Sequence, residues 1–243
     1  MIFALLHETG NNAAEIACHF GPSDHPEVPG RWQYYGVSLP FWRSYDKEDP
    51  RREFFYYDYT GDAKRDDQSD YGFHYMVPEE GVTVVPNDTT KYMQNVATMK
   101  YTYDMISDAY YDGRTICIFR LSDVILCKAE IENNLNGPAA ALPYLNQIRA
   151  RAGAPEYGKH NRFPAPSTKE AMNDAILKER GYELVFEFQR RADLIRFGKY
   201  EEVVNAHLKK LGIAQPTNVT SSLRYFPYPL NDAQLNPNLA AEN

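Results

Sequence analysis

Hydrophobic positions follow two different patterns along the chain. Up to residue 117, short apolar runs alternate irregularly with turn-forming Gly, Pro, Asn and Asp, and no helical or strand period persists. From residue 118, apolar residues recur at the three- and four-residue spacing of amphipathic helices. We therefore predict a mainly α protein with two regions in one compact unit. Residues 1–117 form a loop-rich, aromatic, ligand-facing region with few short strands, and residues 118–243 form a helical scaffold with an extended C-terminal tail.

The helical region begins with a predicted antiparallel helix pair over residues 119–135 and 138–152. Pro138 suits a first helical position and Gly153 a C-cap. Small residues at Ala129 and Ala141 have the spacing that lets helices of a tetratricopeptide-like pair approach closely. One such pair cannot bury its own faces, so it needs neighbours. Five apolar residues fall near helical spacing in the first helix: Leu121, Val124, Ile125, Ile131 and Leu135.

Two further helical stretches follow. The pattern Ser-Thr-Lys-Glu at residues 167–170 is a capping box, and the helix that it opens is predicted to run to about Arg191. A second stretch, 193–211, is expected to break or bend near Gly198. The tail that follows is rich in Pro and Asn, which predicts an extended loop packed on the body.

Composition narrows the functional classes. A net charge of −7 argues against a general nucleic-acid binder. No stretch approaches the ~20 apolar residues of a membrane helix, and the N-terminus lacks the pattern of a signal peptide. Aromatic residues make up 14% of the chain, and residues 1–117 hold 13 of the 19 Tyr and both Trp. This aromatic excess therefore belongs to the loop-rich region.

The best candidate for ligand binding is the aromatic segment 31–45. Flat aromatic faces suit the C–H faces of sugar rings, and planar polar side chains bond to hydroxyl groups. The same chemistry serves protein interfaces, and large aromatics also simply pack an irregular region. The candidate ligand-binding residues are Arg31, Trp32, Gln33, Tyr34, Tyr35, Trp42, Arg43 and Tyr45.

A second pattern is a cluster of charges at residues 179–196. Glu179, Glu183 and Glu187 repeat every four residues and would share one helix face. Two of them could be the acid and base of a glycoside hydrolase, but carboxylates on one face lack the opposed placement that this reaction needs. We therefore favour a structural ion-pair network and predict no catalytic residue. Its members are Glu179, Arg180, Glu183, Glu187, Arg190, Asp193 and Arg196.

Metal and cofactor signals are weak. No His-x-x-x-His pair, Cys-x-x-Cys pair or Gly-rich phosphate loop is present. The segment 58–70 carries five Asp but lacks the spacing of a calcium-binding EF-hand, so a solvated surface loop is favoured. We predict no metal and no cofactor.

Five short motifs occur in the order found in the SusD/RagB family of outer-membrane nutrient-binding proteins, and the chain resembles the C-terminal half of these proteins. Residues 120–130 resemble the family's Arg-hydrophobic-x-Asp-Val-Leu-Leu…Ala-Glu helix, and residues 145–153 its Leu-Asn-x-Val-Arg-x-Arg-Ala-Gly sequence. Residues 179–198 resemble its Glu-Arg…Glu-Leu-x-Phe-Glu…Arg…Asp-Leu-x-Arg-x-Gly signature. The terminal Phe-Pro and Asn-Pro-Asn-Leu sequences and Asp49-Pro50-Arg51-Arg52 also fit.

The resemblance implies a function as well as a fold. It implies tetratricopeptide-like helix pairs in a lipid-anchored protein on the extracellular face of the outer membrane. There the protein would capture an oligosaccharide, or as the second choice a peptide, for a SusC-like TonB-dependent transporter, without catalysis. An alternative is a helical-repeat scaffold that binds only protein. The start at Met1-Ile2-Phe3 resembles the middle of a family member, so we expect the family's N-terminal half, with its anchor, to lie outside this chain.

Overall fold

The computed structural model describes residues 2–7, 19–22, 25–26, 33–61, 72–80, 89–101, 115–210, 219–226 and 229–236. The chain divides into two compact units, Met1–Phe188 (unit 1) and Gln189–Asn243 (unit 2), which are treated separately below. The change from loops and short strands to helices lies near residue 118, where the sequence predicts it. The division between the compact units comes later, inside the region predicted to be one helical scaffold.

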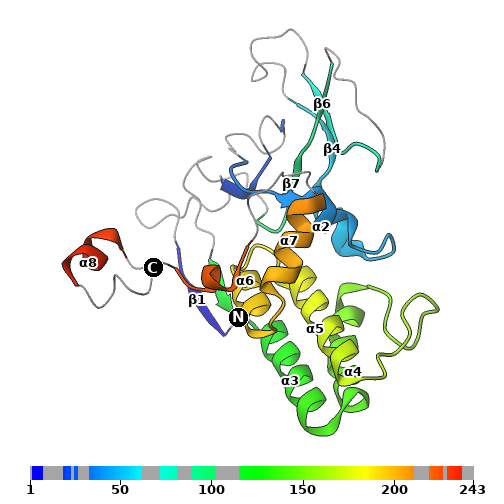
Figure 1. Ribbon diagram of the computed structural model, residues 1–243. Coiled ribbons are helices and arrows are strands. Elements are labelled where there is room, and N and C mark those ends of the chain that lie inside the picture. Colours follow the sequence, from blue (N-terminus) through cyan, green and yellow to red (C-terminus); the bar gives the residue numbers. More distant parts are fainter. Residues whose placement is uncertain are drawn as a thin grey trace. The chain divides into compact units, whose positions relative to one another are not determined.

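Unit 1 contains the predicted helix pair and a third helix beside it. These are α3 (Leu121–Asn136), α4 (Pro138–Ala152) and α5 (Lys169–Glu183), which pack side by side (Figure 1). Ala129, Ala141 and Leu145 are completely buried where the helices meet, because small side chains allow the backbones to approach. Gly153 caps α4 with a φ of 71°, a left-handed conformation that glycine adopts without strain. The prediction of a mainly α fold with tetratricopeptide-like helix pairs is confirmed.

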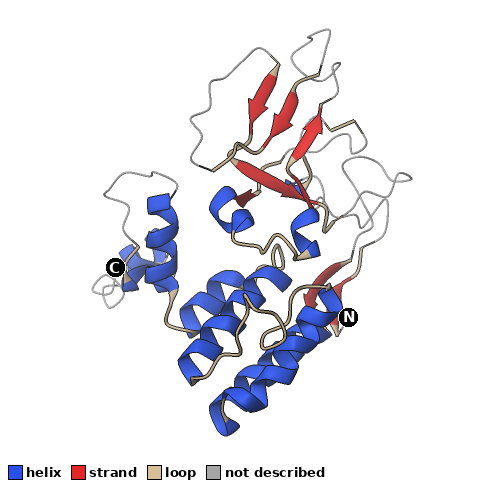
Figure 2. Cartoon of the chain, turned by 90° about the vertical axis from the view of Figure 1, so that its right-hand side faces the viewer, coloured by secondary structure: helices blue, strands red, loops and turns tan. Residues whose placement is uncertain are grey.

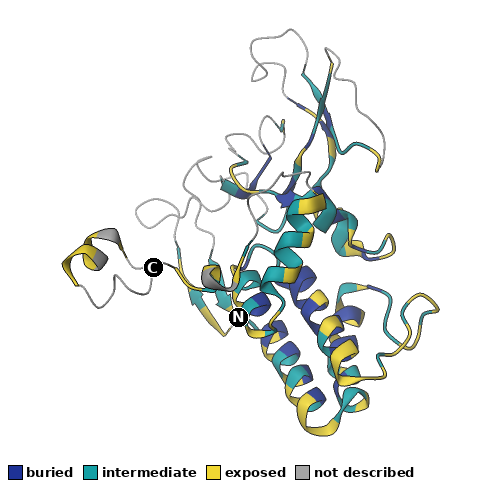
Figure 3. Ribbon diagram, viewed as in Figure 1, coloured by how far each residue is buried: buried dark blue, intermediate teal, exposed yellow. Residues whose placement is uncertain are grey.

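The buried face of α3 differs from the one that its apolar spacing suggests. Leu121, Val124, Ile131 and Leu135 are all exposed, and the outer side of this helix is largely yellow in Figure 3. The buried face instead holds Leu126 and Ala129 together with polar residues that have partners on α5. Asn133, for example, donates from Nδ2 to the backbone oxygen of Lys169 at 2.9 Å. Hydrophobic spacing therefore located this helix correctly but assigned its core face to the wrong side.

Helix α5 begins one residue later than the capping box implies, and it ends early. Thr168 is its N-cap, and the Thr168 hydroxyl accepts from the Ala171 amide at 3.1 Å. The expected continuation to Arg191 is wrong, because the helix ends at Glu183. Beyond it, Phe186 and Phe188 have φ angles of 60° and 62°, which a right-handed helix does not contain.

In its described residues, the loop-rich part of unit 1 forms three small sheets, whose strands are the red arrows in Figure 2. The first pairs β1 (Phe3–Leu5) with β8 (Ile116–Phe119) in antiparallel fashion. In the second, β7 (Asn95–Thr98) lies between β2 (Val37–Ser38) and β3 (Phe55–Tyr56). In the third, β5 (His74–Met76) is antiparallel to β4 (Asp58–Thr60) and parallel to β6 (Thr90–Tyr92). The short helix α2 (Leu39–Arg43) and the 3-10 helix η1 (Pro50–Glu53) connect these strands.

One hydrophobic cluster joins this loop-rich part to α5. Val96, Phe55 and Trp42 contribute to it from β7, β3 and α2, and Tyr182 contributes from the last turn of α5. Val96 is fully buried and Phe55 is 2% exposed. The aromatic region and the helices of unit 1 therefore share a core.

Unit 2 contains α6 (Arg190–Arg196), α7 (Tyr200–Lys210), the 3-10 helix η2 (Ser221–Arg224) and α8 (Leu230–Leu235). Gly198, with a φ of 68°, separates α6 from α7, so the predicted break is confirmed. The tail from Tyr225 onward, expected to be an extended loop, includes the helix α8 in its described part. Within the described ranges, no helix is long and apolar enough to cross a membrane.

Candidate functional site

Two residues of the predicted ligand-binding segment, Trp42 and Tyr45, are core residues. Trp42 is 5% exposed, its indole N–H donates to the Arg52 backbone oxygen at 3.3 Å, and the Arg52 guanidinium lies 4.3 Å from the ring centroid. Tyr45 is 3% exposed and stacks on Tyr182 with 4.2 Å between ring centroids. For these two residues we replace the ligand-contact prediction with a packing role, because both side chains are almost completely buried.

Tyr34 and Tyr35, in contrast, are 65% and 60% exposed. The His19 ring lies 5.4 Å from the Tyr34 ring and 6.1 Å from the Tyr35 ring, and the Tyr35 amide donates to the His19 carbonyl oxygen at 3.1 Å. Tyr35 also contacts Phe20, with 5.7 Å between centroids. We call Tyr34 and Tyr35 the tyrosine pair. Among the described residues predicted to bind a ligand, these two present exposed aromatic rings.

The other predicted residues of this segment have different positions. Gln33 donates from Nε2 to Oδ1 of Asn95 at 3.1 Å, which connects it to β7. Arg43 is half-buried and donates to the backbone oxygen of Pro78. Arg31 and Trp32 lie outside the described residues.

Three buried carboxylates at the end of α5 form the centre of an ion-pair network. Glu179 bonds to Arg51 and Arg149 through its two oxygens, each at 2.7 Å. Glu183 and Glu187 are 4% and 5% exposed. Arg120 joins them, since its Nη1 lies 2.6 Å from Glu183 Oε1 and its Nε lies 2.7 Å from Glu187 Oε2. Three further ion pairs complete the network: Glu183 with Arg151, Glu183 with Arg51, and Glu187 with Lys100.

The same cations cap the C-terminal end of α5. Lys100 Nζ donates to the backbone oxygens of Glu183 and Val185 at 3.0 and 2.9 Å. Arg120 Nη2 donates to the Glu183 oxygen at 2.7 Å, and the Tyr101 hydroxyl donates to Phe186 O at 2.8 Å. Carbonyls at a helix C-terminus have no partner within the helix and carry partial negative charge, so cations stabilise them. These contacts explain why the helix can end at Glu183 while its last carbonyls remain bonded.

The charge environment of Glu183 is poorly suited to acid catalysis. Burial raises the pKa of Glu183, but Arg120, Arg151 and Arg51 outweigh that effect and hold the pKa below its usual value. A general acid needs the opposite, a raised pKa that keeps its proton near neutral pH. Glu187, four residues beyond the end of the helix, accepts hydrogen bonds from Arg120 through both of its carboxylate oxygens. The arrangement favours the structural interpretation of these carboxylates over the hydrolase interpretation.

The remaining members of the predicted network are distributed between the two units. In unit 1, Arg180 is buried and pairs with Asp123 of α3 at 2.6 Å. In unit 2, Asp193 and Arg196 pair with each other across one helical turn at 2.9 Å, and Arg190 begins α6.

The cations of the network come from distant segments that the charge pattern did not include. Arg51 lies 128 residues before Glu179, and Arg120 lies 67 residues before Glu187. The family-like motifs contain four of these cations: Arg51, Arg120, Arg149 and Arg151. Their place in a motif was the sequence signal that could have identified them. Lys100 lies in no motif, and the sequence carried no signal for it.

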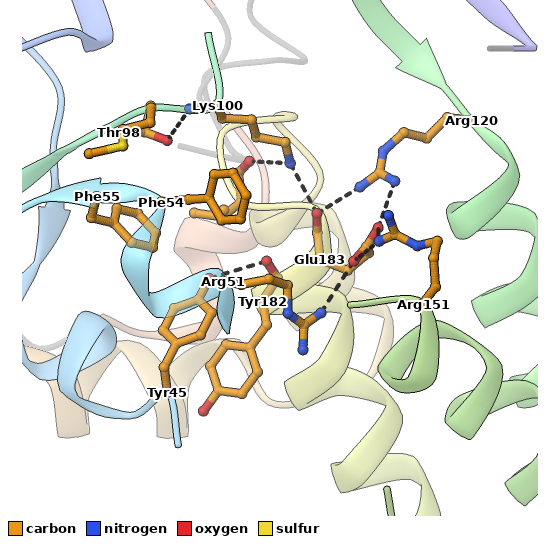
Figure 4. Close-up of a pocket in the computed structure, with 12 residues that line it drawn as sticks. Tyr45, Arg51, Phe54, Phe55, Thr98, Lys100, Arg120, Arg151, Tyr182 and Glu183 are labelled. Carbon is orange, nitrogen blue, oxygen red and sulfur yellow. Dashed lines mark hydrogen bonds and ion pairs between the residues drawn. The ribbon is translucent and has the colours of Figure 1, made fainter. Parts of the chain in front are cut away.

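A cavity of about 380 Å³ opens beside this network (Figure 4). Charged side chains line one part of it, and Phe54, Phe55, Tyr45 and Tyr182 line another. Burial raises the pKa of Tyr182 to about 12, so its hydroxyl is neutral at physiological pH. Burial lowers the pKa of Lys100, and its pair with Glu187 opposes that shift. The charged lining residues are Arg51, Lys100, Arg120, Arg151 and Glu183.

No cluster of three or more potential metal ligands occurs among the described residues. The segment 58–70, expected to be a solvated loop, is described only up to Gly61.

Paired tetratricopeptide-like helices beside a loop-rich aromatic region define a helical scaffold of the tetratricopeptide type. The SusD family profile matches residues 31–243, and the chain belongs to the SusD family. A SusD-like protein of Formosa agariphila is 39% identical over 120 residues, which cover 49% of this chain and 22% of that protein. The starch-binding protein SusD of Bacteroides thetaiotaomicron is 28% identical over 137 residues, covering 56% of this chain and 22% of that protein.

Solved structures show the same fold. Surface glycan-binding protein A of Bacteroides thetaiotaomicron, in complex with laminarihexaose, has a TM-score of 0.62 at 20% identity, covering 96% of this chain and 50% of that chain. A SusD superfamily protein of Bacteroides vulgatus has a TM-score of 0.61 at 23% identity, covering 97% and 49%. The chain thus spans about half the length of these structural relatives, and the matched part is about a fifth of the curated relatives.

Proposed function

We propose that this protein captures an oligosaccharide at the outer-membrane surface and delivers it to a SusC-like TonB-dependent transporter, without changing it chemically. The observation that carries the proposal is membership of the SusD family over residues 31–243. A relative of the same fold holds laminarihexaose, which supports a carbohydrate as the ligand class.

The tyrosine pair is the proposed contact surface. Two neighbouring exposed aromatic rings give a sugar chain apolar faces to stack on, and their phenol groups bond to hydroxyls. The absence of catalysis is supported by the carboxylates, because Glu183 and Glu187 are engaged by cations rather than placed on opposite sides of a groove.

Calorimetric titration with laminarihexaose and a panel of other neutral oligosaccharides tests the proposal. Tyr34→Ala and Tyr35→Ala are expected to weaken binding roughly 10- to 30-fold each, the usual effect of removing a central aromatic contact of about 2 kcal/mol. Tyr225→Ala is the matched control, because Tyr225 is 77% exposed and lies in unit 2. Equal binding by wild type and both tyrosine-pair variants would contradict the contact surface.

Three further measurements separate the alternatives. Product analysis after prolonged incubation should show uncleaved oligosaccharide, and cleavage that Glu187→Gln abolishes would instead favour a hydrolase. Binding of peptides but no glycan would redirect the ligand class, and binding of neither would favour the protein-interaction scaffold. Cleavage of the protein by protease added to intact cells should demonstrate the surface location, and co-purification should demonstrate the transporter complex.

A further inference from the structure

The cavity beside the end of α5 is locally positive in a chain that is acidic as a whole. Four cationic side chains and one carboxylate line it, whereas the chain carries a net charge of −7. Including the residues behind the lining, five cations face four carboxylates: Arg51, Lys100, Arg120, Arg149 and Arg151 against Asp49, Glu179, Glu183 and Glu187. The surplus positive charge is enclosed by low-dielectric walls, which focus its field into the cavity.

Arg151 is the cation in this cavity that is most available to a ligand. Its side chain is 57% exposed, compared with 12% for Arg51 and 22% for Arg120. It bonds to Glu183 through Nη2 alone, at 2.6 and 2.7 Å, so the other edge of its guanidinium remains accessible. An arginine edge with two parallel N–H groups matches the two oxygens of a carboxylate.

An apolar face lies in the same cavity. Phe54 lines it and is 55% exposed, whereas the neighbouring Phe55 is buried in the core. In Figure 4 the Phe54 ring lies beside Lys100, and Arg151 lies on the other side of Glu183. A cavity of about 380 Å³ is at the small end of the usual range for ligand pockets and suits one or two sugar rings.

A series of aromatic contacts runs from the tyrosine pair to a residue next to the cavity. Phe20 contacts Tyr35 at 5.7 Å and stacks on Tyr101 at 5.6 Å, and Tyr101 directly follows the cavity residue Lys100. A sugar chain held at one place would therefore have the other within the same part of unit 1.

We propose that this cavity binds a carboxylate-bearing sugar, with the carboxylate on the open edge of Arg151 and the C–H face of the sugar ring on Phe54. The proposal rests on the proposed glycan capture and adds a ligand class to it, namely oligosaccharides that contain uronic acid residues. Neutral sugar chains would lack the charged contact with Arg151. The cavity would therefore bind acidic glycans more tightly than neutral ones, whereas the tyrosine pair alone would bind both with similar affinity.

The test compares a short oligogalacturonate with its methyl ester, which has the same length and no charge. At pH 7 and low salt the acid should bind at least about tenfold more tightly than the ester, and this preference should fall as salt rises. Arg151→Gln should abolish the preference, and Phe54→Ala should weaken the acid and the ester alike. Lys159→Gln is the matched control, because Lys159 is a 69% exposed lysine in a surface pair with Glu156 that does not line the cavity.

Several outcomes would overturn the proposal. Equal affinity for acid and ester would do so, as would an acid preference that survives Arg151→Gln or that Lys159→Gln reduces equally. Thermal unfolding of each variant checks that Arg151→Gln still folds, and Phe54→Ala leaves the ion pairs in place as a second probe. Tyrosine-dependent binding of laminarihexaose without any acid preference would refute this inference alone, whereas failure of every glycan to bind would refute the proposed function as well. Binding of acidic peptides but no acidic sugar would also overturn it.

Discussion

Replacing Arg120 with Gln removes the cation that joins the two carboxylates at the end of α5. The Arg120 side chain donates to Glu187 at 2.7 and 2.9 Å, to the Glu183 carboxylate at 2.6 Å and to the Glu183 carbonyl at 2.7 Å. Removing one partner of a buried ion pair costs about 3–5 kcal/mol, because the other charge stays buried without compensation. Glu183 keeps Arg51 and Arg151, and Glu187 keeps Lys100, so we expect a loss near the lower end, about 3 kcal/mol.

Urea unfolding followed by circular dichroism measures this loss, and Arg162→Gln is the matched control. Arg162 is an arginine with two carboxylate partners, Asp46 and Glu48, but its side chain is 47% exposed, so its replacement should cost no more than about 1 kcal/mol. A double-mutant cycle with Glu187→Gln should give a coupling energy of about 0.5–3 kcal/mol. If Arg120→Gln costs no more than Arg162→Gln, the network does not stabilise the fold and the structural interpretation of Glu183 and Glu187 is refuted.

Two further predictions concern the aromatic residues. Because Trp42 is a core residue, Trp42→Phe should leave the glycan affinity within about twofold, whereas Trp42→Ala should lower the free energy of unfolding by about 3–5 kcal/mol. A loss of affinity in Trp42→Phe with unchanged stability would instead make Trp42 a ligand contact. Burial raises the pKa of Tyr101 and of Tyr182 to about 12, whereas an unfolded tyrosine titrates near 10. The folded state therefore keeps protons that the unfolded state loses, so stability present below about pH 10 should fall as pH rises toward 12. Tyrosinate absorbance should accordingly show delayed ionisation in the folded protein relative to the protein in urea, and coincident titrations would contradict the buried environment.

Local signals predicted the helices well. The start of α5 to within one residue, Gly153 as a C-cap and the break at Gly198 were all readable, because capping hydrogen bonds and left-handed glycines involve only a few neighbouring residues. The end of α5 was not readable in this way. It depends on Lys100 and Tyr101, which reach the last carbonyls from a segment more than 80 residues away.

The candidate site was predicted only in part for a related reason. Composition pointed to the segment 31–45, but it could not separate the exposed Tyr34 and Tyr35 from the buried Trp42 and Tyr45. An aromatic ring is suited to both environments, so the choice depends on which other elements pack against it. For Tyr45 the deciding neighbour is Tyr182, which lies on α5, 137 residues further along the chain.

The sequence alone determined the mainly helical class, the positions of the helices and the family, since helical periodicity, caps and short motifs are properties of neighbouring residues. Only the tertiary structure decided which face of α3 is buried, where α5 ends and which cations meet its carboxylates. The physical reason is that buried charges need partners, and those partners come from segments as far apart as Arg51 and Glu179. Helical spacing places Glu179 and Glu183 on one face of α5, but Glu187 lies beyond the end of the helix, and folding of the whole unit brings it to the same cation, Arg120.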